Sequence, residues 1–246
     1  MSKWFTATAA LIALYGAYLW AFPTAVVRFR LTANVEVDGK IHSGSSVYEI
    51  RFQRPMIPLG MPYESSFRGE AVAVDLGERG MLFVILDGPR GGEPDHVRML
   101  PERVLVHRTK SIRWPADGDR VKVYSALSEE KWKVDLLPGE FPMLVRFRDL
   151  GDPATAERVD PQKMADAFGA SAGLVGIRME RVDAGSWPLN LLGLDGEPVT
   201  RGIEGKLPWW QRSLPWVKPS GGGFVDSRPV VAREYRLQRE HFIRGL

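Results

Sequence analysis

The four histidines of this chain are its first candidates for catalysis or metal binding. No two of them have the i, i+4 spacing, and none lies in an H-E-x-x-H motif, so no pattern brings two imidazoles to one helix face. The chain has no cysteine, which excludes thiolate catalysis and cysteine-based zinc sites. We therefore predict no metal site and no cofactor. The four are His42, His96, His107 and His241.

A serine nucleophile activated by a histidine is the second possibility. Ser43, Ser45 and Ser46 stand in a Ser-Gly-Ser-Ser sequence, and Asp95 beside His96 would orient that imidazole as a general base. The serines lack the G-x-S-x-G strand-to-helix elbow, because a strand follows them. Small hydroxyl residues inside a hairpin more often bond the backbone or mark a bulge. A serine hydrolase stays an alternative prediction, and we assign no catalytic residue.

Two glycine-rich stretches and two carboxylates have structural explanations. Residues 88–92 and 220–223 lack the G-x-x-x-x-G-K-[ST] spacing and a following helix whose amide groups would hold a phosphate. Both are expected to be loops. Asp75 and Asp87 end neighbouring strands, where capping a turn is a commoner role than paired catalysis.

A segment rich in tryptophan and proline, residues 207–216, is the candidate contact site. Its indoles and neighbouring bases suit a lipid headgroup layer or a groove on a partner protein. The same indoles would also serve as a structural cover over one end of the sheet. The sequence leaves both interpretations open and slightly favours the cover. The candidate contact patch is Trp209, Trp210, Arg212 and Trp216, with Lys206 and Lys218 nearby.

The elements that position these residues follow a membrane-directed segment. Residues 4–22 carry no charged side chain and come directly after Lys3. At about 1.5 Å of rise per residue, such a helix spans most of a hydrocarbon core roughly 30 Å thick. Bulky residues and then Pro23 stand where a signal peptidase prefers small ones, which favours a retained anchor over a cleaved signal peptide. Residues 1–25 are predicted to be a transmembrane anchor.

The positive-inside rule does not orient this anchor. Lys3 lies on one side of it, and Arg28 and Arg30 lie just past the other. An apolar segment this close to the first residue is typical of a bacterial signal anchor. We expect a single-pass inner-membrane protein whose soluble domain faces the periplasm, and a cytoplasm-facing domain is the alternative.

Charge distribution argues against a nucleic-acid partner. The net charge is +3, and residues 218–246 hold six basic and three acidic residues, which leaves 27 of each sign before them. The main domain is therefore neutral by count and lacks the basic footprint of nucleic-acid binding. We predict a soluble β-rich domain at residues 26–217, followed by a glycine-rich linker and basic tail at residues 218–246.

Alternation of apolar and polar residues predicts a first antiparallel hairpin. Residues 27–37 alternate strictly, the pattern of a strand with one buried face. Asp38 and Gly39 form the signature of a type I′ turn, and alternation resumes at residues 47–52.

A second, more apolar hairpin is predicted at the centre of the sheet. Residues 71–76 and 81–86 form its strands, with the turn at residues 77–80. Proline and glycine mark long loops on either side, at residues 55–62 and 87–94.

Shorter elements complete the prediction. One helix is well marked, with Asp160 as its cap, Pro161 at its first position, an apolar stripe through Phe168 and Gly169 as its stop. Further short strands are predicted at residues 103–107, 120–124, 143–147 and 174–182.

Several of these stretches resemble a family of uncharacterised proteobacterial proteins that are anchored in the membrane by a single helix. The resemblance implies a membrane-anchored domain in a bacterial envelope, and it implies no activity, cofactor or catalytic residue. It is carried by residues 43–47, by residues 69–77, by residues 197–200 and by Ile203 with Leu207-Pro208-Trp209.

The sequence therefore predicts a β-rich α+β domain, with an antiparallel sheet built from hairpins and one short helix, behind one N-terminal transmembrane helix. The expected function is that of a non-enzymatic envelope protein that binds or scaffolds a partner at the membrane surface. The expected partners are the membrane itself, through the anchor, and an envelope protein or anionic lipid. A membrane-tethered serine hydrolase and a cytoplasm-facing anchored protein are the alternatives.

Overall fold

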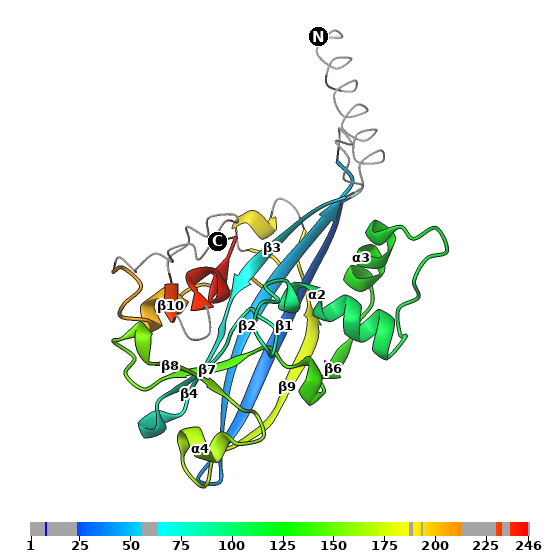
Figure 1. Ribbon diagram of the computed structural model, residues 1–246. Helices are drawn as coiled ribbons and strands as arrows, with labels where there is room; N and C mark the ends of the chain where they lie inside the picture. The colour runs from blue at the N-terminus through cyan, green and yellow to red at the C-terminus, as the bar shows by residue number, and fades with distance from the viewer. Residues whose placement is uncertain are drawn as a thin grey trace, which may run out of the picture.

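Two antiparallel sheets form the body of the protein (Figure 1). The computed structural model describes Thr8 and residues 24–55, 63–186, 189–192, 194–212, 230–232 and 237–245. None of the helices in these ranges is long and apolar enough to cross a membrane. The predicted anchor lies outside the described residues except for Thr8, Thr24 and Ala25, so it stays a prediction.

The larger sheet has six strands in the order β12-β3-β2-β1-β9-β6. The predicted first hairpin is at its centre and is confirmed, including its turn, because Asp38 and Gly39 both have positive φ, at 51° and 74°. The strands are β1 (Thr24–Val37), β2 (Lys40–Gln53), β3 (Glu64–Glu70), β6 (Lys133–Asp135), β9 (Gly173–Val182) and β12 (Ile243–Arg244).

The smaller sheet has four strands in the order β4-β5-β7-β8. The predicted second hairpin forms β4 and β5, but its expected place at the centre of the sheet is wrong. β4 is an edge strand, and that edge lies against β2, where a Cβ on Gly44 would come within 2.3 Å of the Ala73 carbonyl oxygen. The strands are β4 (Val72–Asp75), β5 (Met81–Val84), β7 (Leu144–Phe147) and β8 (Ala156–Val159).

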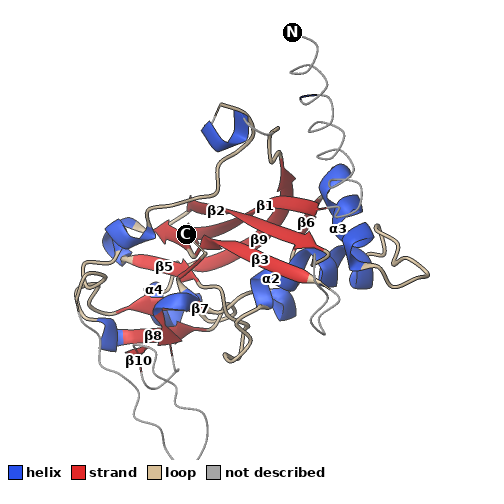
Figure 2. Ribbon diagram, turned by 90° about the horizontal axis from the view of Figure 1, so that it is seen from above, coloured by secondary structure: helices blue, strands red, loops and turns tan. Residues whose placement is uncertain are grey.

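Both faces of the smaller sheet are buried. Leu82 and Val84 of β5 face the larger sheet and join its core, while Phe83 points into a second core on the opposite face. Figure 2 shows the smaller sheet on the side of the molecule away from α3 (Arg120–Glu129). Because both faces of this sheet are buried, the side chains on either face of β4 and β5 are mostly apolar.

Helices replace two of the predicted strands. Residues 103–107 lie in a π-helix (Glu102–Arg108) that continues α2 (His96–Pro101), and residues 120–124 open α3. The Asp119 carboxylate caps α3 by accepting from the Val121 amide at 2.9 Å. Val121, Tyr124 and Leu127 then follow at three-residue spacing and are buried, which is the period of a helix. The β-branched valines of this stretch had suggested a strand.

The predicted helix near residue 160 is confirmed with a later start. α4 spans Met164–Phe168 and ends at Gly169, whose φ is 97°. Asp160 accepts from the Gln162 amide at 2.9 Å, so it fixes the turn before the helix rather than the helix itself. Figure 1 shows α3 beside the start of β1 and α4 beside the β1–β2 turn, at opposite ends of the larger sheet.

Segments from the end of the chain cover the outer face of the smaller sheet. We call residues 203–210 and 237–243 the C-terminal cover. Residues 237–245, predicted to belong to a basic tail, are part of the fold, because β12 pairs with β3 and Leu237 and Phe242 are buried. A short sheet of β10 (Val230–Ala232) and β11 (Leu237–Gln238) precedes them. An isolated sheet with one bare apolar face would be unstable in water, which explains why the chain returns here.

Candidate functional site

The serine and histidine residues considered for hydrolysis do not meet. Ser43 donates to the Asn34 side chain at 2.6 Å, and Ser46 is buried with its hydroxyl unpartnered. The His42 ring bonds the Asp75 carbonyl oxygen at 2.8 Å. Within the described residues, Ser43, Ser45 and Ser46 make no hydrogen bond with a histidine, which a nucleophile and its base require.

Asp95 and His96 point toward different partners. His96 is buried, and its Nε2 lies 2.9 Å from the Glu140 carbonyl oxygen, a donor contact. Its Nδ1 lies 2.9 Å from the Arg103 guanidinium. Asp95 instead binds Arg98, at 3.1 Å. Asp95 and His96 therefore bind separate partners, and Asp95 does not orient the His96 imidazole as a base.

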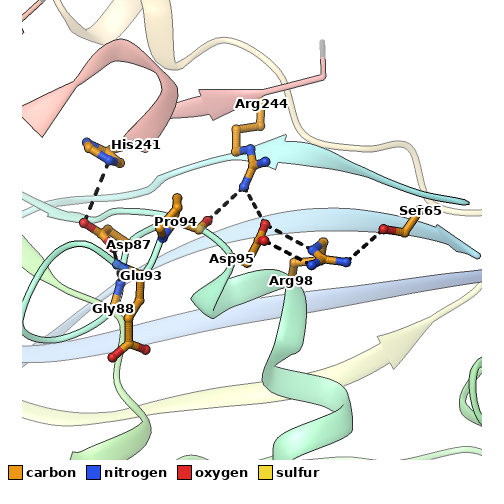
Figure 3. Close-up of polar contacts among 9 residues, drawn as sticks. All are labelled: Ser65, Asp87, Gly88, Glu93, Pro94, Asp95, Arg98, His241 and Arg244. Carbon is orange, nitrogen blue, oxygen red and sulfur yellow. Dashed lines mark hydrogen bonds and ion pairs between the residues drawn. The ribbon is translucent and has the colours of Figure 1, made fainter. Parts of the chain in front are cut away.

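A polar cluster around Asp87 fixes the loop that follows β5 (Figure 3). The Asp87 carboxylate is buried and accepts from the amides of Gly88 at 2.7 Å, Gly92 at 2.9 Å and Glu93 at 2.6 Å. His241 Nε2 lies 3.8 Å from the same carboxylate. The predicted turn-capping role of Asp87 is therefore confirmed, as is the one for Asp75, which accepts from the Gly77 amide at 2.9 Å.

A neighbouring set of contacts connects Arg244, the residue directly after the C-terminal cover, to Asp95 at the start of α2. Arg244 binds Asp95 at 3.0 Å and Arg98 binds it at 3.1 Å, while Arg98 also donates to Ser65 at 2.9 Å (Figure 3). Partial burial acts to raise the pKa of Asp95, but the two guanidinium groups outweigh it and hold that pKa below its usual range. No group of three or more acidic, histidine or cysteine side chains in the described part of the chain could hold a metal ion.

The predicted contact patch is mostly interior. Trp209 is 0% exposed and Trp210 is 9% exposed. The Trp209 ring lies 5.7 Å from that of Phe147 and 6.0 Å from that of Phe242. The structural cover is thus the correct interpretation of these two indoles, because the apolar outer face of the smaller sheet needs it. Arg212 is exposed and donates to the Gly151 carbonyl at 3.0 Å, and Trp216 lies outside the described residues.

A different region combines exposure with unpaired backbone. β6 pairs with β9 only as far as Asp135, and the Leu136 amide then donates to the Ile177 carbonyl at 2.9 Å. Pro138 opens a 3₁₀ helix (Pro138–Glu140) that turns the chain away, since proline has no amide to donate to a ladder. In the described residues, no strand pairs on this side with the part of β9 that precedes Ile177.

A β-bulge in β9 places the side chain of Val175 on this open edge. Asn34 of β1 pairs with Gly176 and Val35 pairs with Leu174, so Val175 has no counterpart. Val175 is 59% exposed, an unusual position for a large apolar side chain in a strand. Bulges commonly re-aim a side chain at the edge of a sheet.

Two adjoining cavities line this edge. One has a volume of about 490 Å³ and runs along β9, and the other has a volume of about 370 Å³ and runs along β8. They share Pro138, Phe141, Pro161 and Gln162, so they form one groove, which we call the β9-edge groove. Of its charged members, Asp135 and Arg178 pair with each other at 2.6 Å, and Arg158 and Asp160 line the part along β8. The part that the two cavities share contains the apolar side chains of Pro138, Phe141 and Pro161.

The β9-edge groove suits an extended peptide. Unpaired amide and carbonyl groups of a strand edge accept another strand, and pockets beside it accept alternate side chains. Four residues of β9, from Gly173 to Gly176, offer roughly 13 Å of edge at about 3.3 Å per residue. Sequence reasoning missed this groove, because it depends on β6 ending at Asp135 opposite Arg178, and only the register of the two strands shows where that pairing stops.

The comparisons with known proteins add no family. No protein-family model, no curated protein and no solved structure matches this chain. The resemblance to a membrane-anchored proteobacterial family therefore stays a prediction.

Proposed function

We propose that this chain is a non-enzymatic envelope protein, anchored in the membrane by residues 1–25, that binds an extended segment of a partner protein along the open edge of β9. The observation that carries the proposal is the β9-edge groove, in which an unpaired strand edge and an apolar trough lie side by side. The catalytic alternative lacks a comparable observation, since none of Ser43, Ser45 and Ser46 makes a hydrogen bond with a histidine in the described residues.

The groove lies far along β1 from the predicted anchor. β1 begins at Thr24, directly after the apolar segment, and Asn34 lines the groove. At about 3.3 Å per residue, these two residues are roughly 33 Å apart along the strand. A site at that distance favours a partner outside the bilayer over the lipid itself. A periplasmic location for the domain is part of the proposal.

Photo-crosslinking tests the groove in the full-length protein. A photoreactive residue at Leu137, which is exposed on the rim next to Pro138, should form a discrete adduct in native membranes. Val175→Asp should reduce that adduct at least about fivefold, because a charge at the edge opposes strand addition. Ile41→Asp is the matched control, since Ile41 is also a β-branched strand residue and is 58% exposed.

Amide hydrogen exchange then distinguishes strand addition from simple contact. Partner binding should slow exchange at residues 174–176, because a new backbone partner protects those amides. Equal loss of the adduct in both aspartate variants would contradict the proposal. Topology is tested separately with C-terminal alkaline phosphatase and cytoplasmic reporter fusions, and activity of the cytoplasmic reporter alone would overturn the periplasmic location.

A further inference from the structure

A short basic stretch between the π-helix and α3 carries the combination of bases and indole that the contact patch lacks. We call residues 107–114 the basic loop. It contains Arg108, Lys110, Arg113 and Trp114 and no acidic residue. Arg108 pairs with Glu140 at 2.7 Å, whereas Lys110 and Arg113 form no ion pair with any described residue. Two cations of the basic loop are therefore free to meet an anion.

The backbone of the basic loop is held in place. The Thr109 amide donates to the Val104 carbonyl at 2.8 Å, and the Ile112 amide donates to the Leu105 carbonyl at 3.1 Å. Ile112 is buried, which anchors the middle of the loop. Lys110 and Arg113, on either side of it, are exposed. The backbone of the loop is thus held in place, while the charged side chains of Lys110 and Arg113 are exposed to solvent.

Trp114 adds an amphipathic side chain to the same surface. Its ring stacks on His107, with centroids 5.8 Å apart, and it is 38% exposed. Of the tryptophans in the described residues, Trp114 is the most exposed. An indole beside free bases is the pairing that favours a membrane–water interface.

The basic loop leads to the end of the sheet from which the predicted anchor departs. Asp119 forms an ion pair with Arg54, which directly follows β2. The preceding residue of β2, Gln53, pairs with Thr24, the first residue of β1. Figure 1 shows α3, which follows the loop, beside this end of β1. The chain that follows the loop therefore returns to the end of the sheet where β1 begins, while the start of the loop lies beside β6, where Arg108 donates to the Asp135 carbonyl oxygen at 3.1 Å.

We infer that the basic loop contacts the headgroups of anionic phospholipids in the membrane that holds the anchor. Lys110 and Arg113 supply the charge complementarity and Trp114 supplies an interfacial ring, and the chain after the loop leads to Asp119, which pairs with Arg54 beside the start of β1. The contact would orient the domain on the membrane. It uses the anchor prediction and none of the groove's unpaired backbone groups, although Arg108 at the start of the loop donates to the carbonyl oxygen of the groove residue Asp135.

A single fluorescent label tests the inference in the full-length chain. Because the chain has no cysteine, Ala116→Cys in the same exposed stretch gives one labelling site for an environment-sensitive dye. The protein is reconstituted in phosphatidylcholine vesicles with and without phosphatidylglycerol, and headgroup spin-labelled lipid is the quencher. We expect at least about twofold more quenching with phosphatidylglycerol, and loss of the difference at high salt.

Charge reversal provides the matched comparison. Lys110→Glu with Arg113→Glu should remove the phosphatidylglycerol-dependent quenching. Lys40→Glu with Lys163→Glu changes the net charge equally at exposed positions elsewhere and should leave it intact. Quenching that is the same in neutral and anionic vesicles, or that both double variants lose equally, would overturn the inference. The cross-link at Leu137 reports the groove independently, so either proposal can fail alone.

Discussion

The C-terminal cover and the basic loop both place tryptophan beside basic residues, yet they use it in opposite ways. In the cover, Trp209 is fully buried against Phe147 and Phe242. In the basic loop, Trp114 is exposed and touches only His107 among the described rings. The difference lies in what is beneath each segment. The cover lies over an apolar sheet face, whereas the loop has already buried Ile112 and leaves its indole outside.

The largest expected effect compares the two tryptophans directly. Trp209→Ala should lower the free energy of unfolding by roughly 3–5 kcal/mol, because it leaves a large cavity between buried rings. Trp114→Ala should change it by less than about 0.5 kcal/mol, the usual range for an exposed side chain. Urea unfolding of both variants measures this. Similar losses in the two would show that the cover and the loop do not differ in the way described.

The next effect concerns the attachment of the cover to the loop after β5. Asp87→Ala removes a buried carboxylate that accepts from three loop amides and should lower the free energy of unfolding by about 2–3 kcal/mol. Asp160→Ala removes an exposed carboxylate that accepts from a single amide, and about 0.5 kcal/mol is expected. A loss at Asp160 as large as that at Asp87 would mean that burial does not set the difference.

A pH effect sharpens the comparison at the start of the cover. Glu70 is buried and accepts from the Ile203 amide at 3.0 Å, and burial raises its pKa above the ordinary value of 4.5. Its neutral form therefore favours folding at low pH, and that contribution is lost as pH rises through the raised pKa.

Glu70→Gln keeps the acceptor and removes the charge. The variant should melt slightly above the wild type at pH 7.5, and the two should converge below about pH 4.5, where the carboxyl is protonated in both states. Melting temperatures across pH 4 to 8 test this. A deficit in the variant at pH 7.5 that disappears below about pH 4.5 would indicate instead that the carboxylate charge stabilises the fold.

The smallest effect is expected in the basic loop. Lys110→Glu with Arg113→Glu should change the free energy of unfolding by no more than about 0.5 kcal/mol, since neither side chain has a described ion-pair partner. Any change should shrink as salt is added, because exposed charges are screened. A loss of several kcal/mol would make the loop a structural element like the cover.

The sequence predicted correctly those elements in which the order of apolar and polar residues alone decides which side chains are buried. The β1–β2 hairpin was predictable because strict alternation and the Asp38-Gly39 turn agree with each other. Residues 120–124 alternate like a strand, with Val121 and Val123 on either side of Lys122, but the Asp119 cap and the burial of Tyr124 and Leu127 belong to a helix.

The candidate site was beyond local patterns. The exposure of Val175 depends on where β6 ends and on the bulge opposite Asn34, which are properties of pairing between distant segments. Burial of Trp209 depends on Phe147 and Phe242 from two other parts of the chain. Sequence correctly proposed a cover, but it could not decide which indoles face inward, because lipid headgroups and an apolar sheet attract the same side chains.

The position of β1 has a mechanical consequence. β1 begins at Thr24, runs through the middle of the six-stranded sheet and pairs with β2 along its whole length and with β9 along most of it. A pull on its first residue, directed along the strand, loads these backbone hydrogen bonds in shear, so that many must break together. The same pull on an edge strand would load only one ladder of hydrogen bonds, whereas β1 has one on each side. The end of the sheet that faces the predicted anchor is thus the end at which the fold best resists tension.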